Sequence, residues 1–200
     1  CADGQVQDAD DLAAIAPAVT DGLAKYGLTG APLPIKSVGV KADLRSYEHP
    51  VLIHGAADWD TLAEASGTMF KTVTGINRTL WNLTDTMPTS FRSLAATMTR
   101  DRLDLLRECD FLMMDGLRRH GLYGEIWQCP TVLVPLEIDG KGQELCILRP
   151  IHSERAMTAT AARLPLDLLE ELKESITALP GISGLAYDLT SKPPGTIEWE

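Results

Sequence analysis

Apolar and polar residues alternate with a period of two in several short segments of the chain, which indicates strands with one buried face. Two of these segments, Pro34–Asp43 and Pro130–Asp139, both begin with proline and end with aspartate. A further apolar run follows each of them, at residues 50–53 and 146–149. The pattern therefore predicts two strands in each half of the chain, in the same order.

A third alternating segment closes each half. Thr74–Thr84 and Pro180–Thr190 share Gly-Ile near the start and Leu-Thr at the end. From residue 34 to residue 130 the offset between the halves is 96, and from residue 75 to residue 181 it is 106. The chain thus contains an internal repeat, and its second copy is predicted to hold ten additional residues, within Ile151–Arg163.

Between the strands the apolar spacing becomes helical. Apolar residues line one face from Trp59 to Val73 and from Leu168 to Leu179. A helical stretch also precedes each copy, at Asp11–Lys25 and Arg100–His120, and the two are ended by Gly27 and Gly121. We expect Pro17 to kink or divide the first of these helices.

The predicted order of elements is α-β-β-α-β, repeated once. This order favours an α+β fold of two tandem two-layer units, each with a mainly antiparallel sheet and helices on one face. The predicted units are residues 1–90 and residues 91–200.

The charge balance limits the possible partners. Eighteen Lys and Arg residues against 28 Asp and Glu residues give a formal net charge of -10, and such a surface repels nucleic acids and anionic membranes. Neither is expected as a partner. An anionic small molecule is compatible, because a few converging basic side chains outweigh a diffuse field at short range.

The four cysteines, Cys1, Cys109, Cys129 and Cys146, form no C-x-x-C pair, and the internal ones lie in apolar runs. This is typical of buried, reduced thiols in the cytoplasm. Their spacing from the histidines matches no zinc site, so no metal is expected. The sequence also contains no run of about 20 apolar residues and no signal segment.

The sequence contains no motif that carries catalysis alone: no P-loop, no G-x-G-x-x-G after a strand, no G-x-S-x-G elbow and no H-E-x-x-H helix. His152 and Ser153 are adjacent in sequence, whereas nucleophile and base converge in space. The chain begins at Cys1 without an initiator Met. We therefore expect an excised fragment without catalysis of its own.

Two segments are candidates for ligand binding. In the tail Ser191–Glu200, two prolines and Gly195 favour a fixed path with a sharp turn, and Lys192 and the Thr196 hydroxyl suit a phosphate. The turn after Pro34–Asp43 carries Arg45 beside Tyr47, whereas the equivalent turn of the second copy is a plain glycine turn. The alternatives are a tail that only packs and a solvated surface arginine.

The ending Tyr187–Glu200 resembles the C-terminus of GMP synthases, including the chain end. Leu33–Val40 and the Asp-x-Arg-Ser-Tyr turn resemble the dimerisation region of the same enzymes. The duplicated arrangement is similar to the long form known from animals, and the resemblance covers the chain from about Leu33.

In that family a glutaminase domain releases ammonia, an ATP pyrophosphatase domain adenylates XMP, and the C-terminal region dimerises and completes the XMP pocket. The resemblance thus implies a homodimer that meets XMP and the upstream domains. ATP and Mg would serve the full enzyme, and no cofactor is expected in this chain.

The resemblance assigns contacts with XMP to five residues, some of them across the dimer: Arg45, Gln128, Lys192, Ile197 and Glu198. The loop Glu154–Thr158 departs from the family, which tends to have an acidic-aromatic pair before Met-Thr. The alternative function is a structural or regulatory dimerisation module that binds no ligand.

Overall fold

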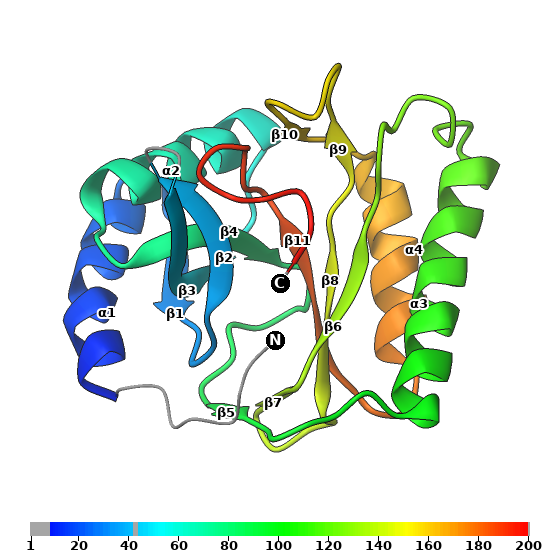
Figure 1. Ribbon diagram of the computed structural model, residues 1–200, viewed down its shortest axis with the longest axis horizontal. Helices are drawn as coiled ribbons and strands as arrows, with labels where there is room; N and C mark the ends of the chain where they lie inside the picture. The colour runs from blue at the N-terminus through cyan, green and yellow to red at the C-terminus, as the bar shows by residue number, and fades with distance from the viewer. Residues whose placement is uncertain (1–8, 42–43, 200) are drawn as a thin grey trace.

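The computed structural model describes residues 9–41 and 44–199, whose strands form a twisted sheet in the order β1-β3-β4-β11-β8-β6, with β2 also paired to β3 (Figure 1). The first half contributes β1 (Thr29–Pro32), β2 (Ser37–Lys41), β3 (Leu44–His54) and β4 (Ile76–Asn82). The second half contributes β6 (Thr131–Val134), β8 (Glu144–Leu148) and β11 (Ile182–Asp188). Pairing is parallel between β3 and β4 and between β11 and β8, and otherwise antiparallel.

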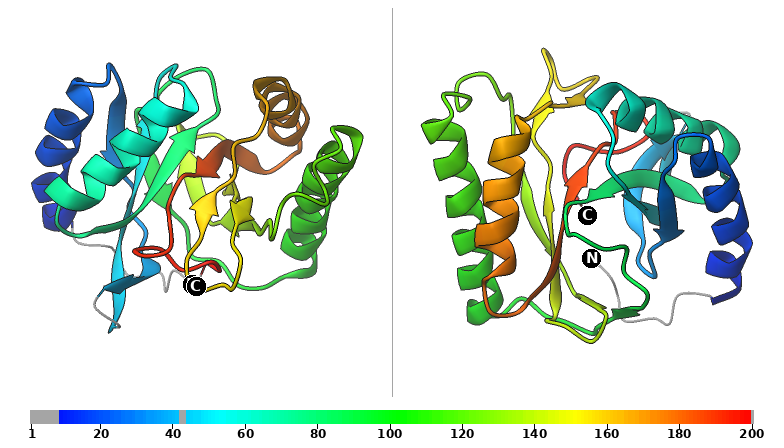
Figure 2. Two further views of the ribbon diagram at one scale, coloured as in Figure 1. Left: turned by 90° about the horizontal axis from the view of Figure 1, so that it is seen from above. Right: turned by 180° about the vertical axis from the view of Figure 1, so that it is seen from behind.

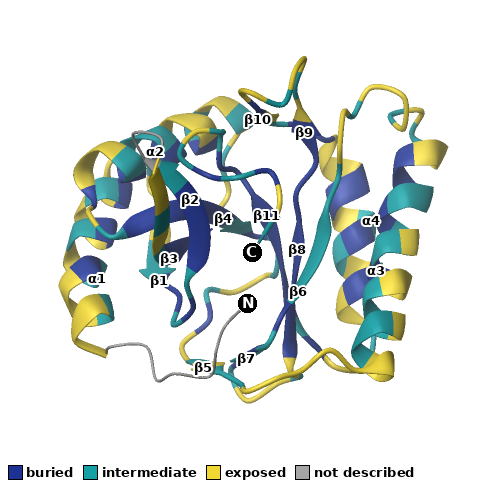
Figure 3. Ribbon diagram, viewed as in Figure 1, coloured by how far each residue is buried: buried dark blue, intermediate teal, exposed yellow. Residues whose placement is uncertain are grey.

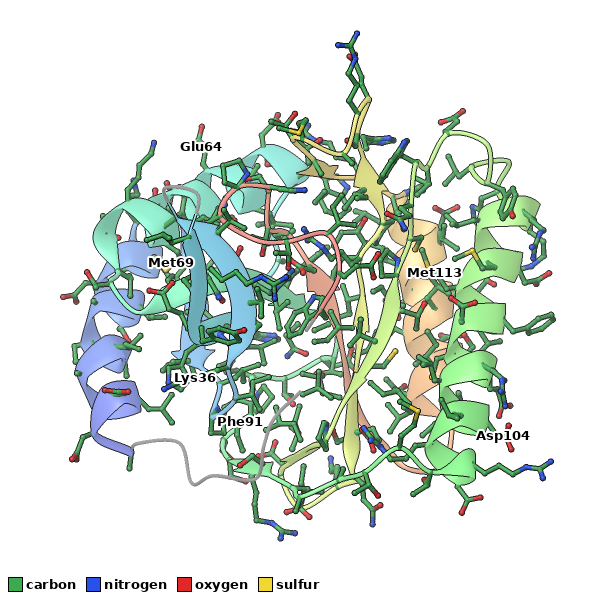
Figure 4. The ribbon with its side chains drawn as sticks, in the orientation of Figure 1. Lys36, Glu64, Met69, Phe91, Asp104 and Met113 are labelled. Carbon is green, nitrogen blue, oxygen red and sulfur yellow. The ribbon has the colours of Figure 1, made fainter. Side chains whose placement is uncertain are left out.

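The helices pack on one side of this sheet and the C-terminal tail lies on the other (Figure 2). They are α1 (Ala9–Ala24), α2 (Trp59–Thr72), α3 (Arg100–Arg119) and α4 (Leu166–Thr177). Their inner faces are buried and their outer faces exposed (Figure 3). Met69 of α2 and Met113 of α3 belong to the core on this side, while Glu64 and Asp104 project outward (Figure 4). No described helix is long and apolar enough to cross a membrane.

A smaller apolar cluster lies on the opposite side of the sheet. It joins Leu52, Leu80 and Ile147 to Trp199 in the tail. The short pair of β5 (Phe91–Ser93) and β7 (Leu136–Ile138) covers its lower edge, where Phe91 packs against the cluster (Figure 4). The tail is therefore part of a second core.

The α+β class is confirmed, but the two halves do not form separate sheets. The antiparallel pairing of β4 with β11, in which Trp81 lies opposite Tyr187, joins them into one mixed sheet. Each half alone would leave a long apolar edge strand at this point, and the pairing removes both edges. The division at residue 90 stays a prediction.

The offset of 106 agrees with the structure residue for residue, since β4 and β11 span 76–82 and 182–188. The offset of 96 is wrong by one for the apolar runs. Val51 lies beside Thr79 of β4, and Cys146 lies beside Leu185 of β11, which corresponds to Thr79, so the offset from 51 to 146 is 95. A shift of one residue turns a side chain to the other face of a sheet. Leu52 accordingly corresponds to Ile147, and both lie in the smaller cluster.

Two further expectations concern the first helix and the inserted segment. Pro17 lies inside α1, which continues through it to Ala24, so of the two predicted outcomes the division of this helix is wrong and the kink stays a prediction. With offsets of 95 before the insertion and 106 after it, the second copy holds eleven additional residues and not the predicted ten. The segment predicted to hold them, Ile151–Arg163, contains a hairpin of β9 (Ile151–His152) and β10 (Thr160–Ala161).

Gly142 marks the place where the hairpin before β8 touches β11. Its φ is +59°, and a Cβ atom there would lie 2.5 Å from the carbonyl carbon of Ile182. Because backbone cannot move aside, we expect Gly142→Ala to lower the free energy of unfolding by about 2 kcal/mol or more. Gly124→Ala is the control, because a Cβ at Gly124 meets no described atom within 4 Å. Equal urea midpoints for both variants would contradict this prediction.

Candidate functional site

The C-terminal tail, residues 189–199, crosses the sheet and touches both halves of the chain (Figure 1). The main chain of Lys192 pairs with Ala159 through two hydrogen bonds of 2.8 and 3.2 Å. Further along, the Val40 amide of β2 donates to the Pro194 carbonyl at 2.7 Å, and Gly39 forms a bridge with Gly195. The tail is thus held by the second half at its start and by the first half at its turn.

A buried ionic cluster underlies the tail. Asp188 is the last residue of β11, and the neighbouring strands provide Arg78 in β4 and Arg149 directly after β8. Both guanidinium groups lie close to Asp188 Oδ2, at 2.9 Å for Arg78 and 3.0 Å for Arg149, and all three side chains are fully buried. Two positive charges share one carboxylate, so the cluster has a net charge of +1.

The tail accepts most of the other hydrogen bonds of the arginines, and the Val38 carbonyl of β2 accepts one from Arg78 at 3.3 Å. Arg149 donates to the carbonyl oxygens of Thr190, Thr196 and Ile197 at 2.8–3.0 Å. Arg78 donates to the Thr196 hydroxyl at 2.7 Å and to the Glu198 carbonyl at 2.9 Å. Carbonyl oxygens carry partial negative charge, so these contacts compensate the excess positive charge without a second acid.

Trp199 closes the cluster from the solvent side. Its indole Nε1 donates to Asp188 Oδ2 at 2.8 Å, and its ring lies 4.5 Å from the Arg78 guanidinium carbon. An indole in this position combines a hydrogen bond with a cation–π contact and keeps water away.

The charges in the cluster shift the acidity of its members. Burial of Asp188 raises its pKa. Arg149, Arg78 and the hydrogen bonds from Thr190 lower it by more than burial raises it, so the pKa of Asp188 lies below its usual value. Burial, partly offset by Asp188, lowers the pKa of Arg78 to about 10. Both groups are therefore ionised near neutral pH.

The five residues predicted to contact XMP all lie in or beside the tail, except Arg45. Gln128 Nε2 lies 3.4 Å from Glu198 Oε1, which brings two of them together. The Lys192 ammonium donates to the Ala156 carbonyl at 2.6 Å. Ala156 belongs to the loop Glu154–Thr158, and the other residues of this loop border an open hollow of about 860 Å³.

The placement of Arg45 and Tyr47 in the turn is wrong, because both lie in β3, where Arg45 pairs with Val40 and Tyr47 with Val38 of β2. Because Val40 also bonds the tail at Pro194, the β2–β3 hairpin connects Arg45 to the tail through main chain. Asp43, the first residue of the predicted turn, lies outside the described residues.

Ile197 is almost fully buried, and its carbonyl accepts from Arg149. Its side chain packs with Ile151 and Ala159. Its contribution in this structure is thus to anchor the tail.

Arg78, Arg149 and Asp188 were missed by sequence reasoning. Their signal is weak but present: each is a charged residue inside or beside a predicted apolar strand, and charged side chains are rarely fully buried unless paired. His152 and Ser153 form no nucleophile pair, because the Ser153 hydroxyl donates to the Thr158 carbonyl within the loop.

The internal thiols agree with the expectation only in part. Cys109 and Cys146 are buried and Cys129 is half-buried, and none of the three is in a disulfide within the described residues. Burial raises the pKa of Cys129 well above its usual value, so this thiol stays protonated. In the described part of the chain, no three His, Cys, Asp or Glu side chains converge as metal ligands would.

Comparison with known families and proteins identifies relatives of this chain. Residues 115–199 match the model of the GMP synthase C terminal domain. The chain is related to the C-terminal region of GMP synthases. A probable glutamine-hydrolyzing GMP synthase of Leptospira interrogans is 40% identical over 177 residues, which is 87% of this chain and 29% of that protein.

Other GMP synthases match a shorter part. Those of Leifsonia xyli and Corynebacterium glutamicum are each 44% identical, over 115 and 111 residues, or 54% and 52% of this chain. The chain spans 29%, 23% and 21% of the length of these three relatives. The relation to GMP synthases is therefore shown, whereas the resemblance to the duplicated long form stays a prediction.

Asp188→Asn tests the ionic cluster. The neutral amide leaves two buried guanidinium groups without a countercharge, and we expect a loss of about 3 to 5 kcal/mol in unfolding free energy at pH 7. Because the folded pKa of Asp188 is depressed, its contribution is present above the unfolded pKa of about 3.9 and is lost as pH falls through the folded pKa.

The difference in unfolding free energy between the wild type and Asp188→Asn should therefore shrink below pH 4, as measured by urea denaturation at a series of pH values. Asp104→Asn, in an exposed pair with Arg100 and Arg107, is the control and should change little at any pH. A pH-independent difference for Asp188→Asn would contradict the assignment of the effect to its charge.

Proposed function

We propose that this chain is the dimerising, XMP-pocket-completing C-terminal region of a glutamine-hydrolysing GMP synthase. In that enzyme it takes part in the conversion of XMP, ATP and glutamine to GMP and is not catalytic by itself. The observation that carries the proposal is the match of residues 115–199, which ends in the tail that the Arg78–Asp188–Arg149 cluster immobilises.

The chemistry of the tail supports a nucleotide as the ligand. The Lys192 ammonium donates to the carbonyl of Ala156, whose neighbours within residues 152–160 border the hollow, and it can exchange this carbonyl for a phosphate oxygen. A phosphate is the stronger acceptor, because the bond is then charge-assisted on both sides. The carboxylate of Glu198 accepts hydrogen bonds and suits hydroxyl or N–H groups, and Gln128 can donate or accept beside it.

Immobilising the tail before the ligand arrives favours affinity. An unanchored chain end loses conformational entropy on binding, at about 1 to 2 kcal/mol per ordered residue. Here the anchors already hold residues 190 to 199, so the ligand does not have to order them.

The complete enzyme would use ATP and Mg in its upstream domain. The cytoplasm is the compartment that the reduced thiols favour. We place no catalytic residue in this chain.

Lys192→Met tests the proposed phosphate contact. The variant keeps much of the apolar stem and removes the charge, and losing one charge-assisted hydrogen bond should weaken binding by roughly 1.5 to 3 kcal/mol. We expect the Michaelis constant for XMP in the complete enzyme to rise about tenfold to a hundredfold. Lys141→Met, in the exposed turn before β8, is the control. An unchanged Michaelis constant and turnover would favour the module that binds no ligand.

Dimerisation is the second proposed activity. Leu44 at the start of β3 is 73% exposed, and Tyr47, on the same face of the strand as Arg45, is 62% exposed, so each offers apolar surface to a partner subunit. We expect sedimentation at tens of micromolar protein to give a homodimer, and Leu44→Glu to shift it toward monomer. A wild-type chain that sediments only as a monomer would contradict this proposal.

A further inference from the structure

Arg149 donates hydrogen bonds to three main-chain carbonyl groups of the tail. Its Nε donates to the Ile197 carbonyl, Nη1 to the Thr190 carbonyl and Nη2 to the Thr196 carbonyl, at 2.9, 3.0 and 2.8 Å. The three acceptors are main-chain groups from both ends of one tail segment, residues 190–197. One planar guanidinium therefore closes this segment into a loop.

Lys192 lies inside the closed loop and Glu198 directly follows it. Within the described residues, Arg149 bonds neither of these side chains but only main-chain carbonyl groups and Asp188, yet the direction of both side chains depends on where the segment begins and ends. Arg78 contributes at the far end only, through the Thr196 hydroxyl and the Glu198 carbonyl.

We propose that Arg149 is a positioning residue for the nucleotide site. It acts through the tail backbone, and its pair with Asp188 supplies the countercharge that allows it to stay buried. The inference rests on the proposed function for the identity of the ligand, but the loop closure itself does not depend on any ligand.

Arg149→Lys separates geometry from charge. Lysine keeps the positive charge beside Asp188, but a single ammonium on a flexible stem does not reproduce the planar fork that reaches three carbonyl groups. If the residue served only to neutralise Asp188, lysine would replace it.

The tail can be followed without ligand by amide hydrogen exchange of this chain. The Lys192 amide donates to the Ala159 carbonyl, and the Gly195 amide donates to the Ser191 carbonyl. We expect Arg149→Lys to accelerate exchange of these two amides by about tenfold or more, because hydrogen bonds to charged groups are lost. Amides of β4 should stay within about threefold of the wild type. Unchanged exchange at Lys192 and Gly195 would overturn the proposal.

Arg102→Lys is the matched control. Arg102 also donates through a fork, to both oxygens of the buried Glu144 carboxylate. Glu144 begins β8 and Arg149 follows its end, about 16 Å away at the usual rise of a strand. We expect this variant to leave tail exchange unchanged, and acceleration as large as in Arg149→Lys would overturn the specific role of Arg149.

If Arg149→Lys does not fold, the unmodified chain still decides the matter. The tail is terminal and irregular, so without anchoring it would fray and exchange far faster than the sheet. Protection of the Lys192 and Gly195 amides within about tenfold of β11 supports the proposal, and exchange faster than that by orders of magnitude overturns it.

Binding of XMP to the complete enzyme then separates this inference from the proposed function. Arg149→Lys and Lys192→Met should both raise the Michaelis constant for XMP about tenfold or more, while only the former loosens the tail. If Arg149→Lys loosens the tail but neither variant changes the Michaelis constant for XMP, the proposed ligand is refuted and the loop closure by Arg149 is still supported. A loosened tail with an effect of Lys192→Met alone would overturn the positioning role.

Discussion

Asp188 accepts hydrogen bonds from Arg78, Thr190 and Trp199 and is also paired with Arg149. The two cores of the molecule depend on this arrangement. A lone carboxylate buried at the end of the central strand β11 would be strongly destabilising. Arg78 from one side and Arg149 from the other stabilise its charge at 2.9 and 3.0 Å. The excess positive charge is in turn compensated by carbonyl groups of the tail and by the Trp199 ring. The sheet and the tail are therefore electrostatically coupled.

The same arrangement connects the two repeats. Arg78 belongs to the first half and Arg149 to the second, and the strand that carries Asp188 pairs with both β4 and β8. The point where the repeats meet is consequently the point where the tail is attached. Tail residues proposed to contact XMP thus rest on the best-buried part of the sheet, which is suited to holding a ligand-binding segment in a defined position.

The loop between β9 and β10 adds a feature that the family resemblance did not include. Its Ala156 carbonyl holds the Lys192 ammonium at 2.6 Å, and Ala156 has a φ of +58°. The tail lysine is therefore held by a main-chain carbonyl of the segment between β9 and β10.

Much of the fold was determined by local pattern. The period of two in residues 76–82 and 182–188, and the period of 3.6 in α2, α3 and α4, predicted these elements and their order, because these patterns depend only on which side chains face a core. The strands β1 and β5 were not predicted, because four and three residues are too short to show a period. The assignment of XMP contacts to Lys192, Glu198 and Gln128 came from sequence resemblance and stays a prediction. What only the tertiary structure decided was the pairing of β4 with β11 and the one-residue correction that places Leu52 with Ile147. The burial of Arg78, Arg149 and Asp188 was also decided there. Strand partners and buried charge pairs depend on residues far apart in the chain, 110 positions in the case of Arg78 and Asp188, and no local periodicity records such a contact.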